Sequence, residues 1–374
     1  MRYLVFTNTP AHVHLYRDAV RELLNRGHDI IVLARDYAYT LQLLEWYEYP
    51  YKVYGVCDTT PYSLFKRLRS HYARIVRHAR AFDLNLIFGM GSYATHASTI
   101  MRTRTVLLLD SEPTTVDHLV SRPFADALLT PATFRKDLEA DHYVFGGFNE
   151  TAYLHPETFS PDPSVRDRLG VGEDDYIIVQ FNAFGSHHDV GEGGFSPEQC
   201  RLLVTNLAES ATVFVSDKGG NIDFDEVLAR PHDLHPALMH DALAEASLVV
   251  TDTQTLATEA ALLGTPTVRS NSFVGKSDMG NFVELGEADL IENLQEFDEV
   301  RATALALLKS DDGAETLRRR REEYLAGLVN LTRVTVDVAT NPTDLESVDS
   351  LVRRASDEAE ETTDTATKTV SVKP

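Results

Sequence analysis

Short apolar runs alternate with helical and polar segments along most of the chain. The first run, "RYLVF" in residues 2–6, is followed by the polar segment "TNTPAH" and then by apolar residues at helical spacing from Leu15 to Leu24. A second apolar run, "DIIVLAR", follows Gly27. Two buried strands joined through a loop and a helix are typical of a parallel β-loop-α-β unit. The start of the chain therefore predicts such a unit.

The same alternation continues as two series of apolar runs. The first series goes on with "DLNLIFG", "TVLLL" and "ADALLT", and the second contains "DYIIVQF", "ATVFVS", "SLVVTD" and "PTVRS". Between them, residues 155–175 collect three prolines and two glycines, which favour a connection between domains. We therefore expect an α/β protein of two doubly wound, Rossmann-like domains that face each other across a cleft.

The expected domain boundaries follow from this pattern. Residues 1–160 form the first domain, and residues 161–338 form the second domain. From residue 339 onward the hydrophobic periodicity fades, and the acidic, Thr-rich end "SDEAEETTDTATKTVSVKP" contains no aromatic residue. We expect residues 339–374 to be a disordered tail.

Composition and charge narrow the class of protein. The 374 residues are 43% hydrophobic, which suffices for two cores. The formal net charge of −22 argues against a nucleic-acid partner, because such proteins bind mainly by neutralising phosphates. An acidic excess of this size is associated with salt-loving archaea. No apolar stretch has the length of a signal peptide or a membrane span, so we expect a cytoplasmic protein.

The segment "TDTQTLATEAALLGTP", residues 251–266, follows the expected strand "SLVVTD" and opens a helix. At the carboxyl end of a parallel strand, a helix start points free N–H groups and a positive dipole end outward, which suits a phosphate. Thr253, Gln254 and Thr255 occupy this turn, and Glu259, one turn further, can accept hydrogen bonds from both ribose hydroxyls. The alternative is an ordinary capped helix with a solvated glutamate.

Two further segments follow strands of the expected first domain. "TNTPAHVH" contains His12 and His14, and a histidine there can act as a general base, bind a metal, or form structural hydrogen bonds. "DSEP" places Asp110 and Glu112 two positions apart. These carboxylates suit acid-base work or recognition of sugar hydroxyls, while a plain turn explains them equally well.

The Gly-rich segment "FNAFGSHHDVGEGGF", residues 181–195, follows the first strand of the expected second domain. Its backbone N–H groups can wrap a diphosphate, with His187 or His188 as additional donors. Metal binding by these histidines and Asp189 is a weaker option, and a flexible interdomain loop is the plain alternative. We expect no metal site.

The segment "SLFKRLRSHYARIVRHARAF", residues 63–82, is amphipathic, and its polar face is basic without any acidic residue. Lys66, Arg67, Arg74 and Arg77 are candidates for contact with anionic lipid headgroups or with a lipid-phosphate acceptor. The plain alternative is a helix that packs on the sheet and leaves a solvated basic face.

Taken together, the strings "TPAHVHLYRDAVRELLNRGHDIIVLARDY", "GGFNETAYLHP", "HHDVGEGGF" and "DTQTLATEAALLGTP" resemble an uncharacterised prokaryotic family, common in archaea and catalogued as a domain of unknown function. That family is similar to GT-B nucleotide-sugar enzymes. The resemblance spans roughly residues 1–335 and implies the GT-B fold, without specifying a reaction.

Two relatives of known chemistry suggest roles for individual residues. In the peptidoglycan N-acetylglucosaminyltransferase, a loop histidine precedes a helix that ends at a glycine, and here this pattern resembles His12 and Gly27. In the non-hydrolysing UDP-N-acetylglucosamine 2-epimerase, a Ser-Gly-Gly turn and a helix glutamate hold UDP. The counterparts here resemble residues 253–255 and Glu259, although the small glycines are missing.

The same epimerase has three further turns with counterparts in this chain. Its His-x-Glu-Ala-Gly turn resembles "DSEP" with Glu112, and its His-Arg-Arg-Glu-Asn loop resembles "SHHDVGEGG" with His187 or His188. Its Gly-Asp-Thr turn resembles "FGMGSY", where Met90 replaces the catalytic acid. A thioether cannot move protons, so this difference weighs against 2-epimerisation.

We therefore expect a glycosyltransferase that moves a sugar from a nucleotide-diphosphate sugar, such as a UDP-sugar, to a glycan or polyprenyl-phosphate-type acceptor. In this hypothesis His12 deprotonates or orients the acceptor hydroxyl, while residues 253–255 neutralise the diphosphate without a metal or other cofactor. One alternative is a sugar-nucleotide epimerase that uses Glu112 and His187 or His188 as proton carriers. Another is a non-catalytic binding protein. In the transferase hypothesis the first domain binds the acceptor and the second domain binds the nucleotide sugar. We also expect a peripheral position at the inner face of the cell membrane.

Overall fold

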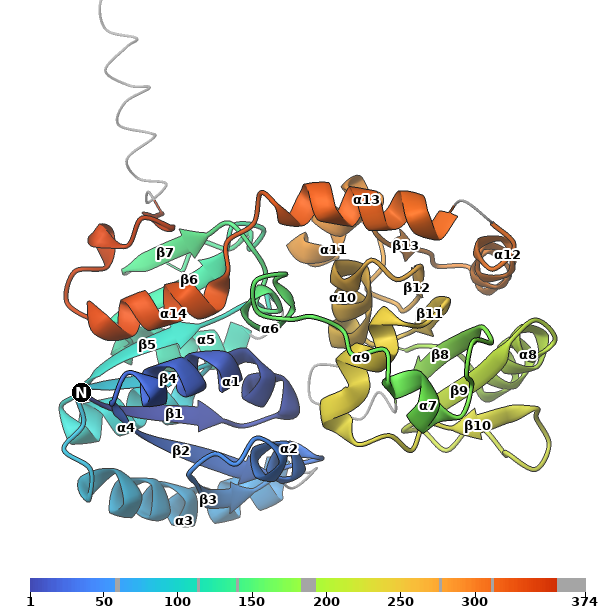
Figure 1. The fold of residues 1–374 in the computed structure, drawn as a ribbon. Coiled ribbons are helices and arrows are strands. Elements are labelled where there is room, and N and C mark those ends of the chain that lie inside the picture. The colour runs from blue at the N-terminus through green and yellow to red at the C-terminus, as the bar shows by residue number, and fades with distance from the viewer. Residues whose placement is uncertain are drawn as a thin grey trace, which may run out of the picture.

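The computed structural model describes residues 1–57, 61–112, 115–138, 141–182, 193–275, 278–310 and 313–354, with backbone only at 61–66, 115 and 314 (Figure 1). It contains an eight-stranded and a six-stranded sheet. We call the first sheet with its helices the first lobe, and the second sheet with its helices the second lobe. The two lobes confirm the expected pair of doubly wound α/β units.

The first lobe is built on a sheet of strand order β14-β7-β6-β5-β4-β1-β2-β3, in which the described pairs are parallel except for β14 with β7. Its strands are β1 (Arg2–Thr7), β2 (Asp29–Asp36), β3 (Tyr51–Val56), β4 (Leu86–Gly89), β5 (Arg104–Leu108), β6 (Ala127–Pro131), β7 (His142–Phe145) and β14 (Leu351–Arg353). Its helices are α1 (Pro10–Asn25), α2 (Thr40–Trp46), α3 (Pro61–Arg80), α4 (Ser92–Met101), α5 (Thr115–Ser121), η1 (Arg122–Phe124), α6 (Thr151–Leu154), α14 (Leu331–Thr340) and η3 (Leu345–Ser347).

The second lobe has the all-parallel strand order β10-β9-β8-β11-β12-β13. Its strands are β8 (Tyr176–Phe181), β9 (Thr212–Asp217), β10 (Ala229–Pro231), β11 (Leu248–Thr251), β12 (Thr267–Arg269) and β13 (Glu292–Asn293). Its helices are α7 (Val165–Leu169), α8 (Pro197–Ala208), η2 (Pro236–Leu238), α9 (Met239–Ala244), α10 (Gln254–Leu263), α11 (Gly280–Glu287), α12 (Phe297–Leu307) and α13 (Gly313–Leu325).

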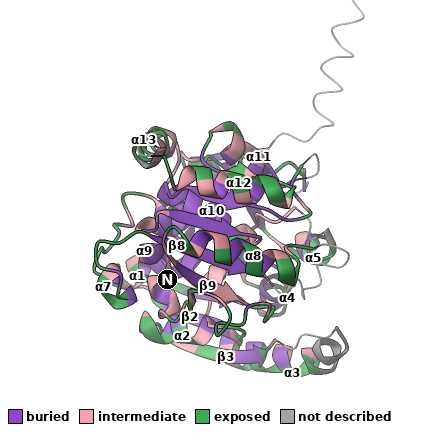
Figure 2. Ribbon diagram, turned by 90° about the vertical axis from the view of Figure 1, so that its right-hand side faces the viewer, coloured by how far each residue is buried: buried purple, intermediate pink, exposed green. Residues whose placement is uncertain are grey.

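Alternating strand residues divide the interior into layers. In β1, Tyr3 and Val5 face one core, while Leu4 and Phe6 face another that lies under α3 and α4. The core of Tyr3 and Val5 continues into the second lobe beneath α9 and α10, so one apolar cluster joins the lobes. Figure 2 shows the buried strands and α10 at the centre, with exposed positions on the outer helices. Strands buried on both faces explain why the apolar runs predicted them reliably.

The C-terminal segment corrects the expected domain boundaries. Helix α14 returns to the first lobe, where it packs against α1 and α6, and the hydroxyl of Tyr3 donates to the carbonyl of Ala339 at 3.0 Å. Strand β14 then pairs antiparallel with β7. The expected second domain therefore extends too far, and the expected tail of residues 339–374 begins too early. Residues 355–374 of that tail lie outside the described residues.

Two smaller points of the fold bear on the site. Helix α1 begins at Pro10, since proline suits the first helical position. His12 therefore lies in the first turn of a helix and not in the expected loop.

In the described part of the chain, no helix combines the length and the apolar character needed to cross a bilayer.

Candidate functional site

The strand order brings the predicted residues of the first lobe to one edge of its sheet. The carboxyl ends of β5, β4 and β1 lie side by side. Strand β5 leads to Asp110 and Glu112, β4 leads to Met90, and β1 leads to His12. Met90 packs against the shared core. The second lobe meets this edge, because the backbone N–H of Gly280 donates to Glu112 at 3.2 Å. The first-lobe candidates therefore line up where the two lobes touch.

The predicted anion-binding turn of the second lobe forms the start of α10. Thr253 is the N-cap residue, with Gln254 and Thr255 as the first two helical residues, and Thr255 is exposed. The Thr253 hydroxyl does not cap the helix, because it lies 2.9 Å from the hydroxyl of Thr251 instead. The first-turn N–H groups of α10 thus lack a side-chain cap from Thr253, which leaves them available to an anion.

Glu259 has a different environment from the one that the sequence suggested. Its side chain is not solvated, since the residue is only 5% exposed and lies between the lobes. Its Oε1 atom accepts a hydrogen bond from the Tyr153 hydroxyl at 2.8 Å, and His240 Nε2 lies 3.0 Å from the same oxygen. Its Oε2 atom has no hydrogen-bond partner among the described residues. One carboxylate oxygen is therefore held by the fold, and the other stays available.

His14 takes part in this interface and not in a pair with His12. Its ring packs on that of His240, with 4.6 Å between centroids, and on Tyr153. Burial, the neighbouring His240 and then Arg17 lower the pKa of His14 well below its ordinary value. His14 is accordingly a neutral packing residue, which favours the structural alternative for this histidine.

His12 is set up as a hydrogen-bond donor. The backbone N–H of Asn8 donates to its Nδ1 atom at 3.3 Å, so the neutral ring carries its proton on Nε2. Burial and the positive charge of Arg35 lower the pKa of His12 to about 3. The ring also lies at a helix N-terminus, where a positive charge is disfavoured. Of the two predicted roles, this arrangement favours orienting a substrate oxygen over removing its proton.

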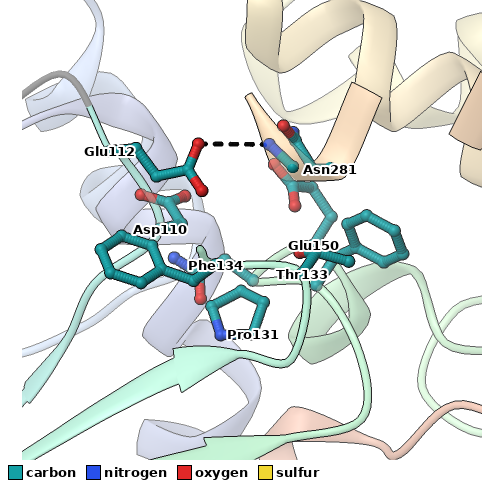
Figure 3. A pocket seen from close by; sticks show the side chains of 10 residues that line it. Asp110, Glu112, Pro131, Thr133, Phe134, Glu150 and Asn281 are labelled. Atoms are coloured by element: carbon teal, nitrogen blue, oxygen red, sulfur yellow. Dashed lines mark hydrogen bonds between the residues drawn. The ribbon is translucent and has the colours of Figure 1, made fainter. Parts of the chain in front are cut away.

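A pocket between the lobes brings three carboxyl groups together (Figure 3). The hollow is shallow, with about 270 Å³ of empty space that includes open solvent and only about 10 Å³ of it enclosed. Its lining residues are Asp110, Glu112, Pro131, Thr133, Phe134, Phe148, Asn149, Glu150, Gly280 and Asn281. Acidic groups from the first lobe and an amide from the second thus surround one hollow.

Within this pocket, Glu112 bridges the lobes. One carboxylate oxygen accepts the backbone N–H of Arg135 at 2.7 Å, and the other accepts that of Gly280. The contact requires glycine at position 280, because a Cβ atom there would clash with the carbonyl of Thr133. Both oxygens of Glu112 are therefore engaged, which suits a residue that holds the lobes in register better than one that carries protons.

Glu150 is the group in the pocket that suits proton transfer. It is 9% exposed, and burial followed by the nearby charges of Asp110 and Glu259 raises its pKa to about 8. Burial also raises the pKa of Asp110. A carboxyl group whose pKa lies near neutral pH can exchange a proton in either direction during a reaction.

Glu150 and Asn281 were not singled out in the sequence. Glu150 lies in "GGFNETAYLHP". The sequence signal that could have indicated it is that it is the one acidic residue of this segment. Asn281 is the second residue of α11, and its buried Oδ1 atom lacks a partner among the described residues, so it is a free acceptor at the pocket.

Asp252 lies just before α10. Burial raises its pKa to about 7, although the backbone N–H of Asn182 donates a hydrogen bond to it at 2.7 Å.

The remaining predicted residues lie elsewhere. His187, His188 and Asp189 fall in residues 183–192, outside the described residues. Arg67, Arg74 and Arg77 are exposed on α3 and do not line the pocket, and the side chain of Lys66 is not described. The structure thus separates the basic helix from the pocket.

Comparisons with known proteins identify the fold. No family model and no curated protein sequence matches the chain, so the resemblance to an uncharacterised prokaryotic family stays a prediction. Similar solved structures include a putative UDP-N-acetylglucosamine 2-epimerase from Listeria monocytogenes, with a TM-score of 0.61, 14% identity, and coverage of 92% of this chain and 98% of that one.

Two further solved structures are comparably similar. Spinosyn forosaminyltransferase SpnP has a TM-score of 0.59 and 14% identity, over 92% of this chain and 99% of that one. The Anabaena protein HepE in complex with UDP-glucose has a TM-score of 0.59 and 17% identity, over 91% and 100%. The two-lobed GT-B fold is therefore shared with a putative UDP-N-acetylglucosamine 2-epimerase, a forosaminyltransferase and a protein that binds UDP-glucose.

Proposed function

We propose that this protein is a GT-B glycosyltransferase that moves a sugar from a nucleotide-diphosphate sugar to the hydroxyl of a glycan or lipid-linked acceptor. The observation that carries the proposal is the presence of two complementary features, one on each lobe. The second lobe offers an uncapped helix start at α10, and the first lobe offers Glu150 with a pKa of about 8. An anion site and a proton acceptor are the two groups that this transfer needs.

On the donor side, the first turn of α10 would bind the diphosphate. The N–H groups and hydroxyls at Thr253, Gln254 and Thr255 supply hydrogen bonds, and the helix dipole supplies positive potential. The free Oε2 atom of Glu259 would accept a hydrogen bond from a ribose hydroxyl. Tyr153 and His240 fix the other oxygen, so they would preset the orientation of this carboxylate.

On the acceptor side, Glu150 would take the proton of the attacking hydroxyl. The acceptor oxygen forms a bond to the anomeric carbon as the bond from that carbon to the diphosphate oxygen breaks. The proton moves to the Glu150 carboxylate, and the departing diphosphate stays at the start of α10. At pH 7 about a tenth of a group with this pKa is ionised, and the ionised form is a stronger base than an ordinary glutamate.

His12 and Glu112 would support this step without carrying the proton. His12 would donate from Nε2 to a substrate oxygen, in keeping with its accepting Nδ1 atom. Glu112 would hold Gly280 and α11 against the first lobe. Because the helix start neutralises the leaving group, the proposed reaction requires neither a metal nor another cofactor.

A sugar-nucleotide epimerase is the second candidate, supported by the similarity to the Listeria structure. Epimerisation by elimination and re-addition needs acid-base groups on the nucleotide sugar itself. Met90, which packs against the core, cannot supply one of them. This residue is our reason for placing transfer first.

The test is to incubate the whole protein with UDP-glucose, UDP-N-acetylglucosamine and other nucleotide sugars, and to follow them by phosphorus and proton NMR. Each sugar is tested alone and with a polyprenyl phosphate or an oligosaccharide. Release of nucleotide diphosphate that depends on an acceptor, with a new glycosidic signal, is the expected result. Interconversion of sugar isomers without acceptor would instead establish the epimerase. Absence of binding to every nucleotide sugar would reject both functions.

A further inference from the structure

Helix α5 has its apolar side chains on the outside. Val116 and Leu119 are 77% and 67% exposed, while His118 and Ser121 of the same helix are buried. Phe124, in the adjoining η1, and Ile100, on α4, are exposed as well. Helices on the surface of a monomer normally have the opposite arrangement. Contiguous exposed apolar residues indicate an interaction surface. We call Ile100, Val116, Leu119, Val120 and Phe124 the apolar patch.

Helix α3 adds positive charge next to this patch. Arg69, Arg74, Arg77 and Arg80 are exposed, and within the described part of the chain they form no ion pair. The positive charges affect a neighbouring side chain: burial lowers the pKa of His78 most, and the charges of Arg77, Lys52 and Arg74 lower it further. In a chain of net charge −22, a helix with unpaired arginines is a distinct electrostatic feature.

His96 on α4 connects the basic helix with the patch. Its Nδ1 atom lies 2.6 Å from the Tyr72 hydroxyl of α3, and its Nε2 atom lies 3.3 Å from the carbonyl oxygen of Val120. Its ring also packs edge-on against Phe124. In Figure 2, α3, α4 and α5 follow one another along one side of the molecule. Helices α3, α4 and α5, which carry the arginines and the apolar patch, are therefore packed in succession on this side of the molecule.

We propose that this surface docks on an anionic lipid bilayer, with the apolar patch at the boundary of headgroups and acyl chains and the α3 arginines on lipid phosphates. Apolar side chains flanked by cations are the combination that interfacial binding requires. A second copy of this chain fits less well, because a two-fold contact would bring the arginines of both copies into the same interface. An acidic protein partner would pair with the arginines but would leave the apolar patch without an apolar contact.

The surface is linked to the pocket. Helix α5 begins at Thr115, three positions after Glu112, and its buried His118 packs edge-on against Phe134, which lines the pocket. A bilayer bound at α5 would thus lie close to the pocket that holds Glu150. Docking itself does not rest on the proposed transfer, and the two can fail separately.

The test is co-sedimentation of the full chain with vesicles of phosphatidylcholine alone or with 30% phosphatidylglycerol, at about 50 mM salt. Binding should occur on the anionic vesicles and fall as the salt concentration rises. Val116→Asp with Leu119→Asp, and separately Arg74→Glu with Arg77→Glu, should each lower the partition coefficient at least about tenfold. Nucleotide binding and the unfolding midpoint report that each variant is folded.

Matched controls lie on the second lobe. Leu228→Asp removes a side chain that is 88% exposed, and Arg318→Glu with Arg319→Glu reverses two exposed arginines of α13. Both should bind vesicles as the unaltered protein does. Equal binding by the patch variants, or no binding to anionic vesicles, would overturn the proposal. A lipid-free dimer that the Val116 and Leu119 changes dissociate, without vesicle binding, would identify a second copy as the partner instead.

Discussion

The two sheet edges that meet in this protein present their polar groups in opposite ways. On the second lobe, Thr255 is exposed at a helix start, and the adjoining N–H groups lack a side-chain cap from Thr253. On the first lobe, Glu150 is buried, and its pKa is raised to about 8. Accessible N–H groups favour an anion, whereas a buried carboxyl group with a near-neutral pKa favours proton exchange. In the proposed transfer, this difference assigns leaving-group binding to the second lobe and acid-base chemistry to the first.

The largest effect should come from removing the proton acceptor of the first lobe. Glu150→Gln should lower kcat for glycosyl transfer by about 10²- to 10⁴-fold and leave the Kd for the nucleotide unchanged. In the unaltered protein kcat should rise with pH toward about 8 and then level off, since the ionised carboxylate is the active form. Glu173→Gln, an exposed change of the same charge, is the control. An unaltered kcat in Glu150→Gln would exclude this residue as the base.

The next effect should come from closing the anion site of the second lobe. Thr255→Glu places a carboxylate in the first turn of α10, where negative charge stabilises the helix itself. The fold should therefore remain intact while the Kd for UDP rises about 10- to 100-fold by repulsion of the diphosphate. Thr255→Gln, of equal size without the charge, should bind nearly normally. Calorimetric titration measures both, and equal affinities would place the diphosphate elsewhere.

A smaller effect should distinguish ribose binding by Glu259. Glu259→Gln should weaken binding of UDP about tenfold, since the charged acceptor Oε2 is lost. Binding of 2′,3′-dideoxy-UDP should be weak in the unaltered protein and should not fall further in the variant. An equal loss for both nucleotides would instead mean that the substitution disturbs the interlobe contacts with Tyr153 and His240.

The smallest effect concerns the pH dependence of stability. In the native state Glu150 keeps its proton up to a pKa of about 8, whereas the unfolded chain releases it near the ordinary 4.5. Its stabilising effect is complete below that ordinary value and is lost as the pH rises through about 8. Between pH 7 and pH 8 the free energy of unfolding should fall by about 1 kcal/mol more than in Glu150→Gln. Urea titrations at both pH values measure this, and parallel curves would contradict the burial of Glu150.

The same contrast explains what the sequence could predict. The strands and the start of α10 depend on local patterns, and so "SLVVTD" followed by "TDTQTLATEAALLGTP" located both β11 and the exposed turn. The pKa values of Glu150 and His12 depend on side chains brought from distant segments, which no local pattern contains. The same holds for Gly280, whose contact with Glu112 joins residues 168 positions apart.

The C-terminal segment shows the limit of periodicity. Strand β14 has three residues and an exposed Val352, so its local signal is weak, yet it completes an edge of the first sheet. Helix α14 lies mostly before residue 339, and its return to the first lobe depends on contacts with α1 and α6. Local composition predicted a tail from residue 339 onward, whereas long-range packing gives residues up to Arg353 a place in the first lobe.

The most direct measurement is a crystal structure of the protein with UDP and a nonreactive acceptor analogue. We expect diphosphate oxygens within hydrogen-bond distance of the N–H groups of Gln254 and Thr255, a ribose hydroxyl on Glu259 Oε2, and the acceptor hydroxyl beside Glu150. A nucleotide bound away from α10, or an acceptor hydroxyl out of reach of Glu150, would contradict the account of the two lobes.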